Sequence, residues 1–146
     1  MSGTVAQRID EIASEFAELD PRERLELLLE FAEKLPPLPA RYQAERDAGL
    51  NRVHECQTPV FLWTEIEDGQ VRIYADVAPE APTVKGFVSV LVELFSGSGP
   101  EEVLATEPDL VNRFGLVEAL GMVRMRGLHA IAHHIRQKIA KSRNVR

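Results

Sequence analysis

Residues 59–77 read PVFLWTEIEDGQVRIYADV, and this stretch decides the fold. Two runs rich in β-branched and aromatic residues flank Asp68-Gly69, a dipeptide that accepts the positive φ angles of a two-residue type I′ turn. In the second run every other residue is apolar: Val71, Ile73, Ala75 and Val77. We therefore predict an antiparallel hairpin with one buried face. Because a two-stranded hairpin alone is only marginally stable, helices must cover it.

Amphipathic helices are predicted both before and after the hairpin in the sequence. Apolar residues at helical spacing indicate one helix that ends near Leu19 and a second that follows the N-cap Asp20. Residues 84–95 form a strongly apolar run typical of a central core helix, and 122–141 form a last helix with one apolar stripe. The polar residues 40–55 predict a loop with one helical turn at 41–46.

These elements predict the α+β class. A small antiparallel sheet, consisting of the hairpin and an optional third strand, packs against several helices. We expect a single domain over residues 1–146, because 146 residues match one compact domain and its core. Residues 1–7 and 143–146 are expected to be flexible ends.

The composition argues against several functions. Hydrophobic residues make up 45% and charged residues 27% of the chain, which is typical of a globular protein. The net charge of −6 disfavours binding to nucleic acid or anionic lipid. There is no run of about 20 apolar residues for a membrane span and no signal-peptide core near the start. We expect a cytoplasmic protein that binds neither nucleic acid nor membrane.

The charge is unevenly distributed. No acidic residue follows Glu118, but seven basic residues do: Arg124, Arg126, Arg136, Lys138, Lys141, Arg143 and Arg146. The last helix can pair within the chain with its acidic remainder, or it can offer a docking surface to an acidic partner.

Cys56 is the single cysteine, so the chain alone can build neither a disulfide nor a multi-thiolate metal site. It lies between the polar loop and the first strand. Its polar flanks favour a thiol that is not fully buried in the core, although a lone cysteine is often inert and buried. Arg52 and His54 favour its thiolate, whereas Glu55 opposes ionisation. A cysteine hydrolase is disfavoured, because it also needs a committed histidine base and oxyanion donors.

His129 and His133 share one helix face and could ligate a metal. The helix offers no acidic third ligand and no HExxH arrangement, so a solvated basic face is favoured over a metal site.

Four motifs occur in a recognisable order: RLELLLEFAEKLPPLP at 24–39, ECQTPVFLW at 55–63, PTVKGFVSVL at 82–91 and VRMRGLHAIAHHIRQKI at 123–139. From about Arg8 to Lys141, this ordered set resembles the SufE family of sulfur-acceptor proteins. The departures are Glu55 where glycine is frequent, APEAP at 78–82, and Gly121-Met122 where Ser/Thr-Pro often caps the helix.

The resemblance implies a role for each matched residue. Cys56 would accept persulfide sulfur from a SufS-type, PLP-dependent cysteine desulfurase. The protein would stimulate that enzyme and pass the sulfur to a SufBCD-type iron–sulfur scaffold. Gln57 and Thr58 would be its loop neighbours, and Arg124 would lie near the cysteine or the docking region. In the family the loop tucks its thiol toward an apolar hollow and swings out on docking.

PLP would belong to the partner, so this chain would carry no cofactor and, as a carrier, would have no turnover alone. A homodimer is left open. The alternative functions are a non-catalytic binding module with a structural Cys56 and, in third place, a thiol-dependent peroxidase.

Overall fold

The predicted hairpin is present in the structure, a computed structural model that describes residues 3–144. The elements in chain order are α1 (Val5–Ala17), α2 (Pro21–Glu33), α3 (Ala40–Asp47), β1 (Val60–Glu67), β2 (Gln70–Val77), α4 (Pro82–Phe95), α5 (Pro100–Leu104), α6 (Leu110–Arg113), α7 (Val117–Leu120) and α8 (Met122–Asn144). Strands β1 and β2 pair antiparallel, with Glu67 opposite Gln70 at the turn. Asp68 and Gly69 have φ angles of 53° and 77°, as a type I′ turn requires. The α+β class is confirmed.

The optional third strand is reduced to a single bridge. Arg52 forms an isolated antiparallel bridge with Phe61. Apart from this bridge, the sheet within the described residues consists of β1 and β2. Asn51, just before the bridge, has a positive φ of 63°, which turns the chain away from the edge of β1.

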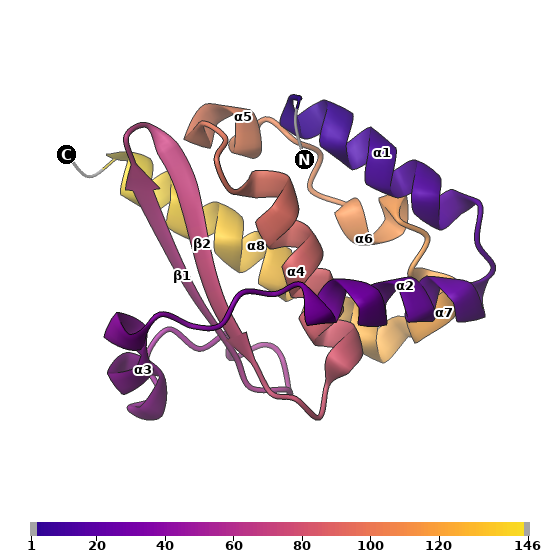
Figure 1. Ribbon diagram of the computed structural model, residues 1–146, viewed down its shortest axis with the longest axis horizontal. Coiled ribbons are helices and arrows are strands. Elements are labelled where there is room, and N and C mark those ends of the chain that lie inside the picture. The colour runs from indigo at the N-terminus through magenta and orange to yellow at the C-terminus, as the bar shows by residue number, and fades with distance from the viewer. Residues whose placement is uncertain (1–2, 145–146) are drawn as a thin grey trace.

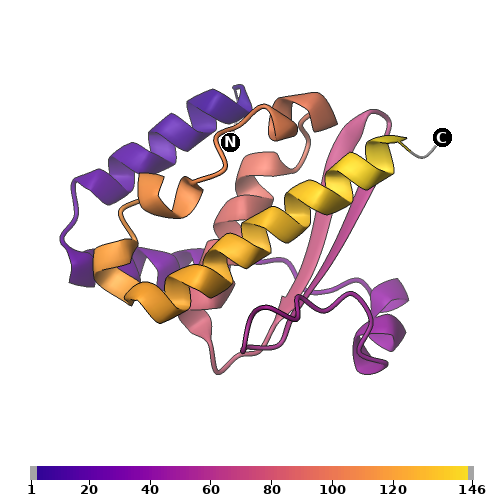
Figure 2. The ribbon, with the colours of Figure 1, turned by 180° about the vertical axis from the view of Figure 1, so that it is seen from behind.

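Helices cover both faces of the hairpin (Figures 1 and 2). On one face α8 packs against β1 and α4 packs against β2. On the other face lies α3, where Tyr42 stacks on Trp63 with ring centroids 5.0 Å apart. The helix α3 is longer than the single turn predicted at 41–46, because tertiary contacts such as this stack favour helix in a polar segment.

Close approach of α2 and α4 requires glycine at one position. A β-carbon on Gly86 of α4 would overlap the backbone carbonyl of Leu28 in α2. Around these helices the core contains a run of stacked aromatic rings, in which Phe16 of α1 packs between Phe31 and Phe114. Buried α4 is therefore the central core helix that its apolar run predicted.

The N-terminal end differs from the expectation of a flexible segment at 1–7. Thr4 caps α1 through a capping box with Gln7, and Val5 is fully buried. A buried apolar side chain and two satisfied backbone amides order this turn. At the other end α8 continues through Arg143 to Asn144. Residues 1–2 and 145–146 of the two expected flexible ends lie outside the described residues.

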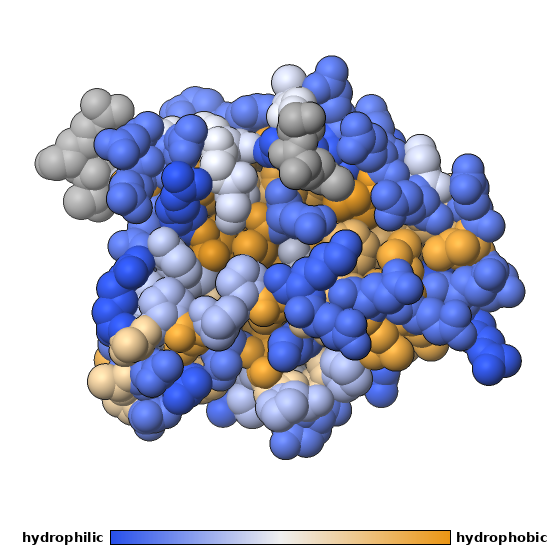
Figure 3. Space-filling model, in the orientation of Figure 1, coloured by the Kyte–Doolittle hydropathy of each residue, from blue (hydrophilic) through white to orange (hydrophobic). Residues whose placement is uncertain are grey.

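The surface is mostly hydrophilic on the face in Figure 3, with apolar atoms in patches between polar side chains. Among the described residues, no helix combines the length and the apolar character that a membrane span needs.

Candidate functional site

A short loop between the Arg52 bridge and β1 positions Cys56. The loop is closed at its base, where the Val53 amide donates to the Val60 carbonyl at 2.8 Å. Among the described residues, a single hydrogen bond involves residues 54–58: the Cys56 amide donates to the Val53 carbonyl at 3.3 Å. The loop is thus fixed at its ends and weakly bonded in between.

Cys56 is buried, with 6% of its surface exposed. The expectation from its polar flanks, that the thiol would stay out of the core, is wrong. His54, Glu55 and Gln57 turn toward solvent, while the side chain of Cys56 turns inward and joins the main hydrophobic cluster. This orientation is the inward tuck that the family resemblance implied.

Gly127 of α8 makes room for the sulfur. A β-carbon at Gly127 would lie 3.4 Å from Cys56 Sγ, so the helix backbone itself forms the surface against which the thiol packs. Residue 127 therefore forms part of the wall beside the sulfur atom, and a side chain larger than alanine there would crowd it.

The thiol borders a cavity of about 590 Å³ between the loop, the start of α4 and the start of α8. This cavity, called here the sulfur cavity, is lined by Glu55, Cys56, Gln57, Thr58, Glu80, Ala81, Pro82, Thr83, Val84, Val123, Arg124, Arg126, Gly127 and Leu128. The structure therefore brings Gln57, Thr58 and Arg124, three residues singled out from the sequence, to one cavity with Cys56.

Two arginines and two glutamates give the sulfur cavity a mixed charge. Arg124 and Arg126 come from the first turns of α8, and Arg124 Nη1 lies 3.5 Å from Thr83 Oγ1 of α4. Glu55 comes from the Cys56 loop, and Glu80 comes from the connection between β2 and α4. Both arginines are exposed, so they are free to meet an anionic group that enters from outside.

Exposed apolar side chains flank this cavity at the start of α8. Met122 is 72% exposed and Val123 is 78% exposed, and Val123 also lines the cavity. Exposed apolar residues beside a cavity make this part of α8 a candidate contact surface.

The histidines do not gather into a metal site. His129 Nε2 lies 3.7 Å from Asp109 Oδ1, His133 is exposed, and His134 is half-buried. No group of three or more possible ligands is placed to hold a metal ion within residues 3–144. His134 Nε2 is buried and has no hydrogen-bond partner among residues 3–144, and burial together with nearby Lys138 lowers the pKa of its imidazole.

The six described basic residues after Glu118 divide into three groups. Arg136 donates to the carbonyls of Leu104 and Thr106 at 2.9 and 2.7 Å, and Arg143 pairs with Glu101 at 3.4 Å. Arg124 and Arg126 line the sulfur cavity, while Lys138 and Lys141 line a second cavity beside β1. Pairing within the chain therefore accounts for only part of this basic helix.

Sequence reasoning missed Gly127 and the exposed pair Met122 and Val123. A glycine inside a predicted helix was the available signal for Gly127, since such a glycine marks a close approach. Two apolar residues at the exposed start of the last helix were the signal for the contact surface.

A family model described as SufE, an Fe-S metabolism associated domain, matches residues 10–139. An uncharacterized SufE-like protein of Mycobacterium tuberculosis is 33% identical over 133 residues, which cover 90% of this chain and 91% of that protein. An uncharacterized SufE-like protein of Synechocystis sp. is 32% identical over 112 residues, or 77% of this chain and 67% of the relative.

A solved structure has the same fold. The solution structure of a hypothetical protein from Thermus thermophilus matches with a TM-score of 0.81 and 37% identity. The match covers 94% of this chain and 97% of the other.

Proposed function

The chain belongs to the SufE family associated with Fe-S metabolism, and on this premise we propose that Cys56 is a sulfur carrier. The observation that carries the proposal is the placement of the single cysteine. It lies on a weakly bonded loop, packs against Gly127, and borders a cavity that Arg124 and Arg126 line.

The chemical step is an exchange of sulfur between two thiols. A SufS-type cysteine desulfurase presents a persulfide, and the Cys56 thiolate attacks its terminal sulfur atom. A new S–S bond forms on Cys56, the S–S bond of the desulfurase breaks, and the desulfurase cysteine leaves as a thiolate. That thiolate takes up the proton that Cys56 gave up, so the step needs no external oxidant or reductant.

The buried resting position of Cys56 fits an acceptor that works only on its partner. A tucked thiol is shielded from oxidants, to which an exposed thiolate is vulnerable. Moving it into solvent costs on the order of 1–2 kcal/mol for a side chain of this size, which contacts with a partner can offset. The single hydrogen bond within 54–58 leaves the loop free to make that movement.

Docking would use the exposed start of α8. Met122 and Val123 supply apolar contact area next to the sulfur cavity, and Arg124 and Arg126 supply positive charge at its border. The matching desulfurase surface would be apolar at its centre and acidic at its rim. Contact there would both open the loop and stimulate the desulfurase.

The remaining parts of the proposal concern partners. PLP acts in the desulfurase, so this chain needs no cofactor of its own for the exchange step. The persulfide on Cys56 passes by the same exchange chemistry to a SufBCD-type iron–sulfur scaffold in the cytoplasm. As a carrier, the chain turns over only together with these proteins.

The burial of Cys56 also favours a second candidate function, a binding module that modulates the desulfurase with a purely structural cysteine. The two candidates differ in what they require of the thiol. A carrier needs it to be reachable during docking, whereas a module needs only the docking surface.

The test measures alanine release by the desulfurase with wild-type protein, Cys56→Ser and Val123→Asp. We expect stimulation by wild-type protein, and its loss in both variants. Iodoacetamide should label native Cys56 faster when the desulfurase is present, because docking opens the loop. Full stimulation by Cys56→Ser, together with no labelling under either condition, would replace the carrier with the module.

A further inference from the structure

The outer edge of β1 is covered along only half of its length. In an antiparallel hairpin, alternate residues of a strand direct their amide and carbonyl groups outward. On β1 the outward amide of Leu62 donates to the Asn51 carbonyl at 3.0 Å, and the outward carbonyl of Val60 accepts from Val53. By the same alternation, Thr64 and Ile66 also face outward. No hydrogen bond among residues 3–144 uses their backbone groups.

The edge is bare because the short third segment ends at Asn51. The positive φ of Asn51, 63°, redirects the chain, and its side chain donates to Glu45 Oε1 of α3 at 3.1 Å. Residues 48–50 therefore turn back toward α3 instead of extending along Thr64 and Ile66. The position of a third strand beside these two residues is vacant within the part of the chain that the structure describes.

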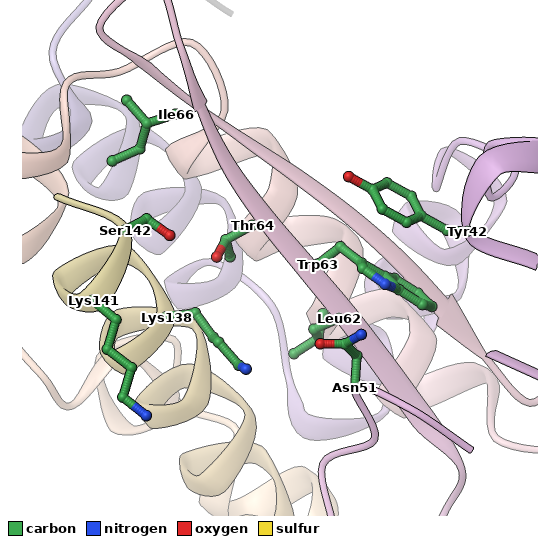
Figure 4. Close-up of a pocket in the computed structure, with 9 residues that line it drawn as sticks. All are labelled: Tyr42, Asn51, Leu62, Trp63, Thr64, Ile66, Lys138, Lys141 and Ser142. Atoms are coloured by element: carbon green, nitrogen blue, oxygen red, sulfur yellow. The ribbon is translucent and has the colours of Figure 1, made fainter. Parts of the chain in front are cut away.

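A cavity of about 490 Å³ occupies this position (Figure 4). Its walls are the bare edge of β1, the turn at Asn51, and the last turns of α8 with Lys138, Lys141 and Ser142. In Figure 4 Thr64 and Ile66 lie on the side of β1 that faces α8, and Lys138 extends from α8 toward the strand. The cavity thus combines unpaired backbone groups with positive charge.

Neither lysine has an ion-pair partner among the described residues. They lie three positions apart on α8, so they point in similar directions beside the edge. A carboxylate on a chain that runs along the edge could reach them. A chain paired with a strand directs every second side chain to one face, so acidic residues at alternate positions would suit this surface.

We propose that Thr64–Ile66, with Lys138 and Lys141, forms a docking site for an extended acidic segment of a partner protein. The segment adds as the missing strand: backbone hydrogen bonds to Thr64 and Ile66 hold it, and the lysines select its acidic side chains. A second copy of this chain fits less well, because edge-to-edge pairing would bring the lysines of both copies together. The site needs no sulfur chemistry and is independent of the role of Cys56.

The experiment uses a fluorescein-labelled peptide of six residues in which glutamate alternates with valine, and measures its anisotropy with the full chain at low salt. We expect saturable binding that Lys138→Glu/Lys141→Glu weakens roughly tenfold or more. Lys34→Glu/Lys85→Glu changes the net charge equally and should leave the affinity within about twofold of wild type. Amide NMR signals of Thr64 and Ile66 should shift on binding.

Several results would overturn the docking site. These are no binding at millimolar protein, equal binding of a peptide in which lysine alternates with valine, or unchanged signals of Thr64 and Ile66. Equal binding by the two double variants would also reject it. If the protein sediments as a dimer and Thr64→Pro dissociates that dimer, the edge of β1 binds a second copy of this chain instead of a partner segment.

Discussion

Gly127 of α8 lies beside Cys56, since a β-carbon built at Gly127 would lie 3.4 Å from the Cys56 sulfur. This contact joins the catalytic candidate to a helix that starts with the exposed residues Met122 and Val123. The exposed start of α8 and the position of the thiol are therefore connected through one helix.

Replacing Gly127 should release the thiol. Gly127→Val adds methyl groups beyond the β-carbon, which leaves no room for the tucked sulfur, so we expect iodoacetamide to alkylate native Cys56 several-fold faster. Gly127→Ala places its methyl group at ordinary contact distance and should alkylate at nearly the wild-type rate. Equal rates for wild type and Gly127→Val would show that Gly127 does not confine the sulfur.

Gly86→Ala should destabilise the fold, because its methyl group would overlap the Leu28 carbonyl and push α2 away from α4. We expect a loss of about 3 kcal/mol in the free energy of unfolding, measured by urea denaturation. Gly99→Ala is the control, since a β-carbon there meets nothing within 4 Å. Similar stabilities of the two variants would argue against the close helix contact.

Arg8 joins α1 to the carboxyl end of α4. It is 7% exposed, and its Nε and Nη2 atoms donate to the Leu94 carbonyl at 3.1 and 2.9 Å. Arg8→Met should cost about 3 kcal/mol, because the buried carbonyl loses a charged donor. Arg22→Met, at a side chain that is 90% exposed, should cost less than about 0.5 kcal/mol in the same urea titration. A near-neutral Arg8→Met would contradict this structural role.

His134 should make stability depend on pH. Its pKa is lowered in the folded chain, first by burial and then by Lys138, while Glu55 acts in the opposite direction. Below the ordinary histidine pKa of about 6.5, His134 binds a proton more readily in the unfolded chain than in the folded chain. The free energy of unfolding therefore falls as the pH decreases.

The measurement compares urea unfolding of wild type and His134→Gln between pH 7.5 and 5.5. The variant should lose less stability over this interval than wild type, since both keep the same carboxylates. Gln137→Asn, at an uncharged and exposed residue of α8, should follow the wild-type curve. Parallel curves for wild type and His134→Gln would show that His134 titrates normally.

Local sequence patterns predicted much of this fold. Asp68-Gly69 specified the hairpin turn, and the apolar run at 84–95 specified the core helix, because turn chemistry and periodicity act over few residues. The length of α3 was not predictable from its polar sequence, since the stack of Tyr42 on Trp63 joins residues far apart in the chain.

The site was predictable in composition but not in geometry. The motif around Cys56 and the distant Arg124 pointed to one region, and the structure places them at one cavity. The inward turn of Cys56 depends on its packing in the hydrophobic cluster beside α8, and the bare edge at Thr64 depends on the backbone angle of Asn51. Both are tertiary features that no local pattern encodes.

The central claim, that Cys56 carries sulfur, is tested most directly by the intact mass of the protein. The chain is incubated with a SufS-type desulfurase and free cysteine, separated without reductant, and weighed beside Cys56→Ser. Wild-type protein should gain the mass of one sulfur atom, which dithiothreitol removes, and Cys56→Ser should gain none. A wild-type protein that stays unmodified while the desulfurase turns over, or a Cys56→Ser variant that gains sulfur, would contradict it.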